Sequence, residues 1–325
     1  MKAAVFAEDG LRIQNVSEPE PEPSQVLVKV HTSGLNRADL GMAAGRKHGN
    51  MGGAGGIAGL EWAGEIVAIG AEVDSLKIGD RVMCTGSGGY AEYAASDWGR
   101  TIRLPSNSMN YEQAVTLPTA LMTMHNALVT AGNLEKGDAV VIQGASSGVG
   151  LMGMQIAKYL GAGLVIGTST NLDRRNRLGE FGADLALDSS DPGWVNAVLD
   201  ATDGKGADLI VDQISAGVMN HNLEASRILG RIVNVGRLGG YSGEFDFDLH
   251  AKRRINYIGV TFRTRSVEEV REINRLMRKD LWGALEEGKL TLPVDKVFPL
   301  DEVAKAQAYM RDNNHFGKIV LRICD

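Results

Sequence analysis

The stretch GDAVVIQGASSGVGLMGMQIAKYLGAGLVIGTSTN, from Gly137 to Asn171, decides the fold of this chain. Residues 139–143 form a short apolar, β-branched run, which is typical of a buried parallel strand. The turn 144–150 follows, and apolar residues then recur at helical spacing from Val149 to Leu160. A glycine next to this helix supplies a stop, and a second apolar strand begins shortly afterwards. The stretch therefore predicts a βαβ unit.

The glycine-rich turn between the strand and the helix predicts a phosphate site. Backbone N–H groups at the start of a helix bind anions, and a dinucleotide pyrophosphate is the anion usually held in this way. Against the pattern G-x-G-x-x-G, Ala145 and Ser147 take the first two glycine positions and Gly150 takes the third. A tight turn without a ligand is the alternative, but strand, turn, helix and second strand come in the order that the motif requires. We expect the pyrophosphate at four residues: Ser146, Ser147, Gly148 and Val149.

The second strand bears on the choice of cofactor. An NAD site usually carries an acidic residue about 20 residues after the glycines. Here residues 167–171 read Gly-Thr-Ser-Thr-Asn, and Arg174 and Arg175 follow. A carboxylate would repel a 2′-phosphate, whereas hydroxyl and guanidinium groups bind one. We therefore predict NADPH, with Ser169, Asn171 and Arg174 at the 2′-phosphate. A solvated helix start is the alternative interpretation of the two arginines.

Length and composition restrict the class of protein. The 325 residues predict two domains, at about 150 residues each. A net charge of −6 disfavours nucleic acid or an anionic membrane as a partner. No apolar run approaches the ~20 residues of a membrane span, and two cysteines cannot build a disulfide framework or a four-cysteine zinc site. We expect a cytoplasmic protein that acts on a small molecule.

The pattern of strands and helices changes near Pro118. The preceding part is rich in short strands and contains the glycine-laden segment 45–59, which we expect to be a loop. After it, apolar strands alternate with helices, and six of them predict a doubly wound, Rossmann-type parallel sheet in an α/β fold. The later four lie at residues 185–187, 209–212, 231–236 and 255–262. We place the dinucleotide-binding domain at 120–263 and assign 1–119 together with 264–325 to the other domain.

Seven motifs are spread over essentially the whole chain, at residues 36–39, 59–64, 79–82, 88–92, 144–150, 235–236 and 317–321. Together they resemble one family, the medium-chain dehydrogenase/reductase superfamily and, within it, the zinc-free quinone oxidoreductases related to zeta-crystallin. The resemblance implies a β-rich, GroES-like catalytic domain in addition to the Rossmann domain.

The resemblance also predicts that no metal is bound. In the zinc alcohol dehydrogenases of this superfamily, a cysteine stands at the position of Asn36 and a histidine at that of Leu60. Neither residue here is a good zinc ligand. The lobe that carries a second zinc would follow Val82, where only five residues precede the Gly88 motif. Without a Lewis acid, hydride transfer to an electron-poor acceptor is more reasonable than alcohol oxidation.

Several cofactor-binding residues are implied by the resemblance alone. They would hold the nicotinamide end and the rest of the cofactor, and they are Asn36, Thr123, Gly236, Leu238, Thr261, Phe262, Arg263 and Lys318. For Asn36 the alternative is a turn cap, and for Thr123 a hydroxyl bonded to its own helix backbone. Arg263 and Arg265 either orient an acceptor oxygen or are solvated. The family often has a tyrosine in the loop after Asp39 and another after the third strand, and this chain lacks both.

The proton donor cannot be assigned from the sequence. Polar candidates are Arg46, His48, Tyr90 and His125, but none belongs to a motif, and His125 is more typical of a packing residue. A quinone needs no fixed acid, so we assign no catalytic residue. We predict an NADPH-dependent reductase of quinones or related conjugated carbonyl compounds, and a homodimer formed through the edge near 255–262. The alternatives are a 2-enoyl or enone double-bond reductase, and an NADPH-binding protein with little turnover.

Overall fold

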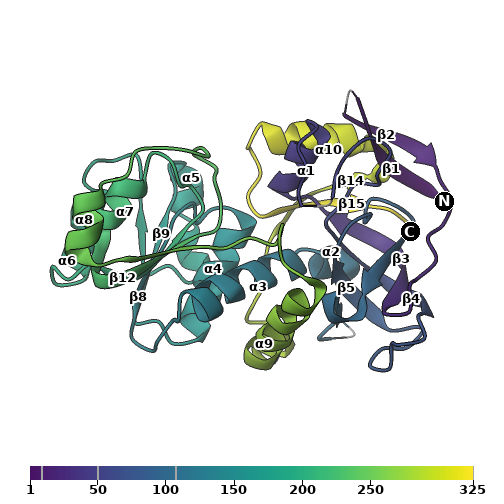
Figure 1. The fold of residues 1–325 in the computed structure, drawn as a ribbon, viewed down its shortest axis with the longest axis horizontal. Coiled ribbons are helices and arrows are strands. Elements are labelled where there is room, and N and C mark those ends of the chain that lie inside the picture. Colours follow the sequence, from purple (N-terminus) through teal and green to yellow (C-terminus); the bar gives the residue numbers. More distant parts are fainter. Residues whose placement is uncertain (9, 50, 107, 325) are drawn as a thin grey trace. The chain divides into compact units, whose positions relative to one another are not determined.

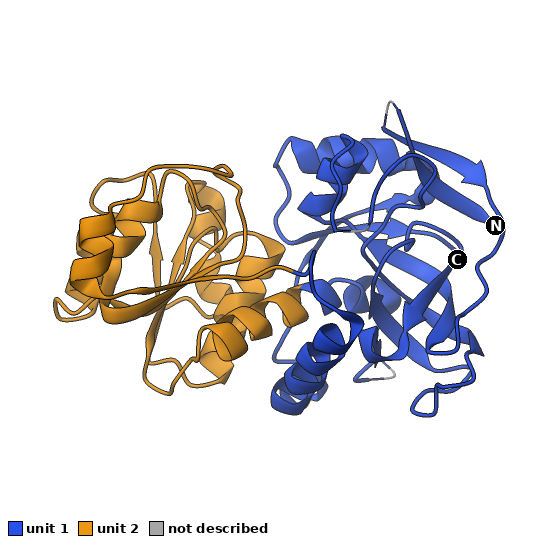
Figure 2. Ribbon diagram, in the orientation of Figure 1, with its two compact units in different colours: residues 1–119, 262–325 blue, residues 120–261 orange. Residues whose placement is uncertain are grey.

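The computed structural model describes residues 1–325 with the exception of 9, 50, 107 and 325. The chain divides into two compact units (Figure 2). The first comprises Met1–Thr119 and Phe262–Asp325, and the second is Ala120–Thr261. The division after residue 261 lies two positions before the boundary that we place at 263 from the sequence. Within the described part of the chain, no helix has both the length and the apolar character needed to span a bilayer.

The second unit is built on a six-stranded sheet in which all neighbouring strands are parallel (Figure 1). The strand order is β10-β9-β8-β11-β12-β13, so the chain winds outward from β8 and then returns to β11 on its other side. This confirms the predicted doubly wound sheet. Ligands of such sheets bind at the carboxyl ends of the strands where the order reverses, here β8 and β11. The strands are β8 (Ala139–Ile142), β9 (Leu164–Thr168), β10 (Leu185–Leu187), β11 (Ala207–Asp212), β12 (Ser226–Asn234) and β13 (Asn256–Gly259).

The helix after the glycine-rich turn, α4 (Gly148–Tyr159), fits the predicted one closely. Most of its apolar side chains are fully buried, and Gly161 at φ +94° follows its end, a conformation that favours glycine. Before β8 the chain forms α3 (Pro118–His125), followed by a π-helix over Asn126–Ala131. The other helices of this unit are α5 (Leu172–Arg175), α6 (Trp194–Ala201), α7 (Met219–Ala225) and α8 (Phe247–Arg253).

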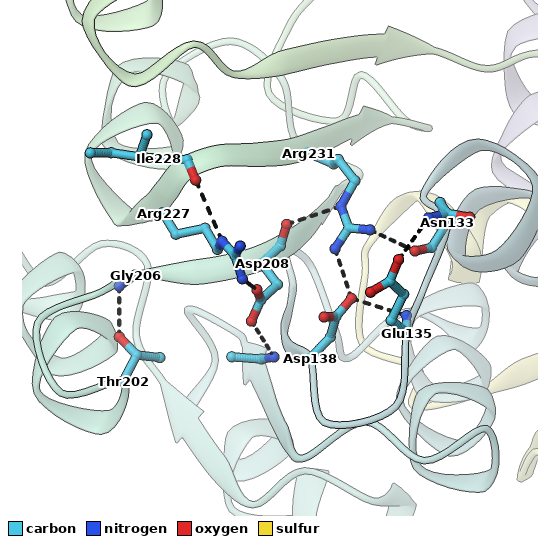
Figure 3. Close-up of polar contacts among 10 residues, drawn as sticks. Asn133, Glu135, Asp138, Thr202, Gly206, Asp208, Arg227, Ile228 and Arg231 are labelled. Atoms are coloured by element: carbon cyan, nitrogen blue, oxygen red, sulfur yellow. Dashed lines mark hydrogen bonds and ion pairs between the residues drawn. The ribbon is translucent and has the colours of Figure 1, made fainter.

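Polar contacts tie the amino ends of the central strands together (Figure 3). Arg231 donates to Asp138 Oδ2 at 2.7 Å, to the Asn133 carbonyl at 2.6 Å and to the Asp208 carbonyl at 3.3 Å. The Asp208 carboxylate in turn accepts from the backbone N–H of Ala139 at 2.8 Å. These contacts link β8, β11 and β12 at the end of the sheet away from the glycine-rich turn.

The first unit is β-rich, as the family resemblance implies. Its larger sheet has the order β14-β15-β3-β4-β5-β7, with β6 also paired to β3, and β1 and β2 form a separate hairpin. The C-terminal strand β15 lies antiparallel to β3, with Val320 opposite Gly34. Strand β4 pairs with β3 so that Glu61 is also opposite Gly34. The strands are β1 (Lys2–Ala7), β2 (Gly10–Asn15), β3 (Gln25–Gly34), β4 (Glu61–Ile69), β5 (Arg81–Thr85), β6 (Tyr93–Asp97), β7 (Thr101–Arg103), β14 (Val294–Pro299) and β15 (Lys318–Arg322).

Helices and irregular segments complete this unit. The helices are α1 (Arg37–Ala43), α2 (Tyr111–Ala114), α9 (Val267–Glu286) and α10 (Val303–Arg311). The expected loop at 45–59 contains no helix or named strand among its described residues, and several of its glycines have φ between +64° and +117°. Such angles are unfavourable for other residues, which explains the glycine content of this segment.

Candidate functional site

The glycine-rich turn presents backbone donors at the start of α4. Ser147 caps the helix, because its Oγ accepts from the N–H of Gly150 at 3.0 Å. A Cβ at Gly150 would lie 2.7 Å from the backbone of Ala145, so glycine allows the helix to pack on the turn. Among the described residues, the N–H groups of Ser146, Gly148 and Val149 have no hydrogen-bond acceptor, and these residues are partly exposed. A helix start with such donors fits a diphosphate.

A network of buried polar side chains is hydrogen-bonded to this turn. Thr168 Oγ1 donates to Gln143 Oε1 at 2.7 Å and accepts from the Gly144 N–H at 3.2 Å. Gln143 Nε2 donates to Asn222 at 2.8 Å, and Asn222 donates to Asp212 Oδ2 at 3.2 Å. Burial raises the pKa of Asp212. The turn is thus connected to the carboxyl end of β11 by side chains that hold one another in place through hydrogen bonds.

The polar residues at the end of β9 have distinct roles. Asn171 Oδ1 caps α5 by accepting from the N–H of Arg174 at 3.0 Å. Arg175 pairs with Asp188 at 2.8 Å and donates to the Ser169 carbonyl at 2.8 Å, so its charge is compensated within the fold. Ser169 Oγ donates to the hydroxyl of Ser146 in the glycine-rich turn at 3.0 Å. The structure therefore joins one predicted 2′-phosphate residue, Ser169, to the predicted diphosphate turn.

Two other predicted residues of the second unit lie beside the same turn. The N–H of Leu238 donates to the Gln213 carbonyl at 3.1 Å, and a Cβ at Gly236 would lie 2.5 Å from that carbonyl. The Gln213 side chain in turn contacts Ser147 and Gly144. Thr123 is half-buried on α3, and Thr261 ends the unit.

In the first unit, Asn36 lies beside a buried ion pair. Lys318 Nζ pairs with Glu61 Oε1 and also donates to Asn36 Oδ1 at 3.1 Å. Asn36 Nδ2 donates to Glu61 Oε1 at 2.9 Å, and Glu61 Oε2 accepts from the N–H of Thr119 at 3.1 Å. The side chains of Lys318 and Glu61 are 8% and 0% exposed. A Cβ at Gly34 would lie 2.6 Å from Glu61 Oε1, so this glycine leaves room for the carboxylate. We refer to Asn36, Glu61 and Lys318 as the lysine cluster.

A second buried carboxyl group, that of Asp39, lies three residues after Asn36 and is hydrogen-bonded to its backbone. Asp39 Oδ2 accepts from the Asn36 N–H at 2.7 Å and from the Tyr90 hydroxyl at 2.9 Å. Burial raises the pKa of Asp39 to about 7, although both hydrogen bonds act in the opposite direction. Tyr90 is fully buried, and burial together with the Asp39 charge raises its pKa. Its phenol therefore has a structural partner and is a poor proton donor to a substrate.

The remaining sequence candidates have different surroundings. His125 is fully buried, as expected of a packing residue. Burial and the positive charge of Arg263 lower the pKa of His48, so its neutral form is favoured. A Cβ at Gly49 would lie 2.5 Å from the Arg263 carbonyl, and Arg265 packs 5.8 Å from the centre of the Phe262 ring. None of the described residues forms a group of three or more His, Cys, Asp or Glu side chains that could hold a metal ion.

Comparison with known proteins places this architecture in a family. The family model for a zinc-binding dehydrogenase matches residues 148–279, and that for an alcohol dehydrogenase GroES-like domain matches residues 22–106. The chain belongs to the medium-chain dehydrogenase/reductase superfamily. Members of this superfamily are oxidoreductases that bind a nicotinamide cofactor. The superfamily and the fold class predicted from the sequence are both confirmed.

The relatives in this superfamily include two kinds of protein. The quinone oxidoreductase of Rattus norvegicus is 28% identical over 315 residues, which cover 96% of this chain and 93% of the relative. A phenolphthiocerol/phthiocerol polyketide synthase protein of Mycobacterium tuberculosis is 27% identical over 97% of this chain. The chain spans only 14% of the length of that synthase protein. Among solved structures, a quinone oxidoreductase of Pseudomonas syringae pv. Tomato DC3000 is 25% identical with a TM-score of 0.87, and the match covers 99% of each chain.

Sequence reasoning missed three polar residues of these sites. Glu61 lies within the motif at 59–64, but the same strand contains Glu65, which is exposed, so the sequence does not indicate that Glu61 has a buried partner. Gln143 and Asn222 carry no such signal either, because amide side chains are common on surfaces. The resemblance predicts that Lys318 binds cofactor, and the structure shows its ammonium engaged by Glu61 and Asn36.

Proposed function

We propose that this chain is an NADPH-dependent oxidoreductase that works without a metal ion and transfers hydride to quinones or related conjugated carbonyl compounds. The lysine cluster carries the proposal. At the two positions where zinc relatives have cysteine and histidine, this chain has Asn36 and Leu60, and neither an amide nor an alkyl side chain suits zinc. The nearby Glu61 carboxylate is already paired with an ammonium. The donor set does not fit a zinc ion.

The cysteine closest to the expected second zinc site gives further support. Cys84 is fully buried, and burial raises the pKa of its thiol to about 12. Zinc takes the thiolate, which this environment disfavours strongly. We therefore propose that neither zinc of the alcohol dehydrogenases is present.

The residues of this chain fit a bound dinucleotide. In the unit 120–261, the donors at Ser146, Gly148 and Val149 would hold its diphosphate. In the other unit, Asn36, whose amide is oriented by both Lys318 and Glu61, is a candidate ligand of the nicotinamide. The reduced nicotinamide supplies the hydride. The protein contributes mainly approximation of the reactants, and the product hydroquinone can take its proton from water. Without a Lewis acid for a developing alkoxide, alcohol oxidation is disfavoured.

Arg174 is our candidate for the choice of NADPH over NADH. No carboxylate stands at 169–171 to repel a 2′-phosphate, and Arg174 lies in α5, which follows these residues. Substituting Arg174→Ala should raise KM for NADPH by about tenfold or more, as expected for loss of a charge-assisted hydrogen bond, while KM for NADH changes little. The control is Arg177→Ala, which removes an exposed arginine paired with Glu180. An unchanged KM for NADPH in the Arg174 variant would refute this assignment.

A second candidate function is reduction of a carbon–carbon double bond in an enone or 2-enoyl thioester. The likeness to the polyketide synthases over 97% of this chain favours it. A spectrophotometric screen separates the two, with quinones, enones and enoyl thioesters offered in parallel and with NADPH and NADH side by side. We expect the fastest NADPH oxidation with quinones. Turnover of only the double-bond substrates would favour the second candidate, and no turnover despite tight NADPH binding would refute both.

The cytoplasmic location and the homodimer stay predictions. Strand β13 lies at the edge of the parallel sheet, and Tyr257 on it is 44% exposed. We propose that two copies pair along this edge, because an uncovered edge strand offers unpaired backbone groups. Sedimentation at several concentrations should give the mass of two chains, and a single chain at all concentrations would contradict the dimer.

A further inference from the structure

A cavity in the first unit has no part in the proposed reaction. It has a volume of about 280 Å³ and lies between β7, the 3₁₀ turn Trp98–Arg100 and helix α9. Its walls include two indole rings, Trp98 and Trp282, together with the aliphatic side chains of Leu76 and Ile102. Two guanidinium groups, Arg103 and Arg278, also line it. The cavity is thus apolar over much of its surface and positively charged at two points.

Helix α9 provides one wall of this cavity and is held firmly. It packs against the 3₁₀ turn, where a Cβ at Gly99 would lie 2.2 Å from the side chain of Arg271. Arg271 forms a bidentate ion pair with Asp97, at 3.0 and 2.7 Å, and lies over the Trp98 ring at 4.8 Å. Arg278 and Trp282 are four positions apart on α9 and therefore share one face of the helix. These contacts position the wall without any ligand.

The charge of Arg278 is not balanced within the fold. Arg103 has a carboxylate partner, Asp80, at 2.7 Å, and Arg271 has Asp97. Arg278 has neither a hydrogen bond nor an ion pair with any described residue, although it is partly buried. Burial lowers its pKa, and no neighbouring carboxylate acts in the opposite direction. A desolvated and unpaired guanidinium lowers stability unless an anion joins it. Although the chain as a whole carries a net charge of −6, this guanidinium group can therefore bind an anion locally.

We propose that this cavity binds a small organic anion, a single carboxylate on a flat apolar body. The carboxylate would pair with Arg278, whose planar fork matches it, and the apolar body would lie against Trp98 and Trp282. One uncompensated guanidinium fits a monoanion better than a phosphate dianion. The volume lies just below the 300–1,000 Å³ range of drug-sized sites, so the ligand is a small molecule rather than a peptide segment.

Binding of 2-naphthoate to the full-length protein tests this proposal, with the neutral 2-naphthamide as a probe of the same shape. Two of the four tryptophans line the cavity, so tryptophan fluorescence and calorimetry both report binding. We expect saturable binding of the carboxylate and at least about tenfold weaker binding of the amide. The Arg278→Met variant should bind the carboxylate about tenfold more weakly and the amide unchanged. Arg275→Met is the matched control, because Arg275 lies on the same helix and pairs with Glu272 at 2.7 Å.

Stability measurements keep the test independent of folding failure. We expect Arg278→Met to have a Tm no lower than that of Arg275→Met, because the substitution removes an unpaired, partly buried charge. Trp282→Leu should weaken both probes. The proposal fails if 2-naphthoate does not bind, if the amide binds equally well, or if Arg278→Met binds the carboxylate as the wild type does. None of these results depends on the reductase activity.

Discussion

Lys318 and Glu61 form the residue pair on which the account depends. Both side chains are almost fully buried, and their hydrogen bonds orient the amide of Asn36. A buried ion pair stabilises a fold little by itself, but removal of one member leaves an uncompensated charge. The Lys318 ammonium therefore compensates the buried charge of Glu61 in a chain that lacks the cysteine and histidine ligands of the zinc relatives.

A double-mutant cycle measures this coupling. Lys318→Met should lower the free energy of unfolding by about 3–5 kcal/mol, because Glu61 is left charged and buried. The double variant with Glu61→Gln should recover part of that loss, since no unpaired charge remains. Chemical denaturation gives each value. Additive losses in the double variant would show that the two side chains are not coupled.

Asp39 predicts a pH dependence of stability. Its pKa in the folded chain is raised from 3.8 to about 7, mainly by burial, so the fold favours the neutral carboxyl group. The stability contribution of this group is complete below about pH 4 and is lost as pH rises through about 7, by at most about 1.4 kcal/mol per pH unit. The Asp39→Asn variant should lack this part of the slope. Stability curves for the two proteins that run parallel over this range would contradict the assignment.

Candidate site residues can be predicted from sequence where a local motif encodes them. Ser146 to Val149 follow from the strand, turn and helix pattern, which lies within one short stretch. The lysine cluster was not predictable in the same way, because Lys318 and Glu61 are 257 positions apart and meet only through the pairing of β15 and β4 with β3. Likewise, the link from Gln143 to Asn222 spans 79 positions.

At the scale of elements, strand β12 differs most from its expected form. The sequence predicts a strand at 231–236, and the structure begins β12 at Ser226, with an irregularity between its pairing at Ser226 and at Arg231. Leu229 in this segment has φ +63° and is 54% exposed. Hydrophobic patterning cannot reveal such a bulge, because its apolar residues face solvent. The π-helix after α3 could not be predicted from hydrophobic patterning either. Its residues are as apolar as those of a regular α-helix, so the pattern does not distinguish the two.

The positive φ of Leu229 in this bulge leads to a prediction about stability. A leucine in the left-handed region is strained by its Cβ, and glycine removes this strain at some cost in chain entropy. Leu229→Gly should therefore raise the free energy of unfolding by about 0.5–1 kcal/mol. The matched control is Ile228→Gly, because Ile228 is equally exposed but has no positive φ. A loss of stability in the Leu229 variant would mean that this side chain makes a contact we have not recognised.

At the scale of the whole molecule, the two units divide the proposed tasks. The unit 120–261 carries the diphosphate turn and the residues at the end of β9, and the other unit carries the lysine cluster and the Arg278 cavity. The parallel sheet followed from sequence because its strands alternate regularly with helices. The order of the seven-stranded sheet did not, because β3 pairs with β4, β6 and β15, which come from three separate parts of the chain.

The most direct test of the metal-independent mechanism is to measure the zinc content and the activity of one sample. The purified protein is dialysed against a strong chelator, its zinc is quantified by mass spectrometry, and NADPH oxidation with a quinone is followed before and after. We predict far less than one zinc per chain and an unchanged rate. About one zinc per chain, with activity lost on chelation and restored by zinc, would contradict the account.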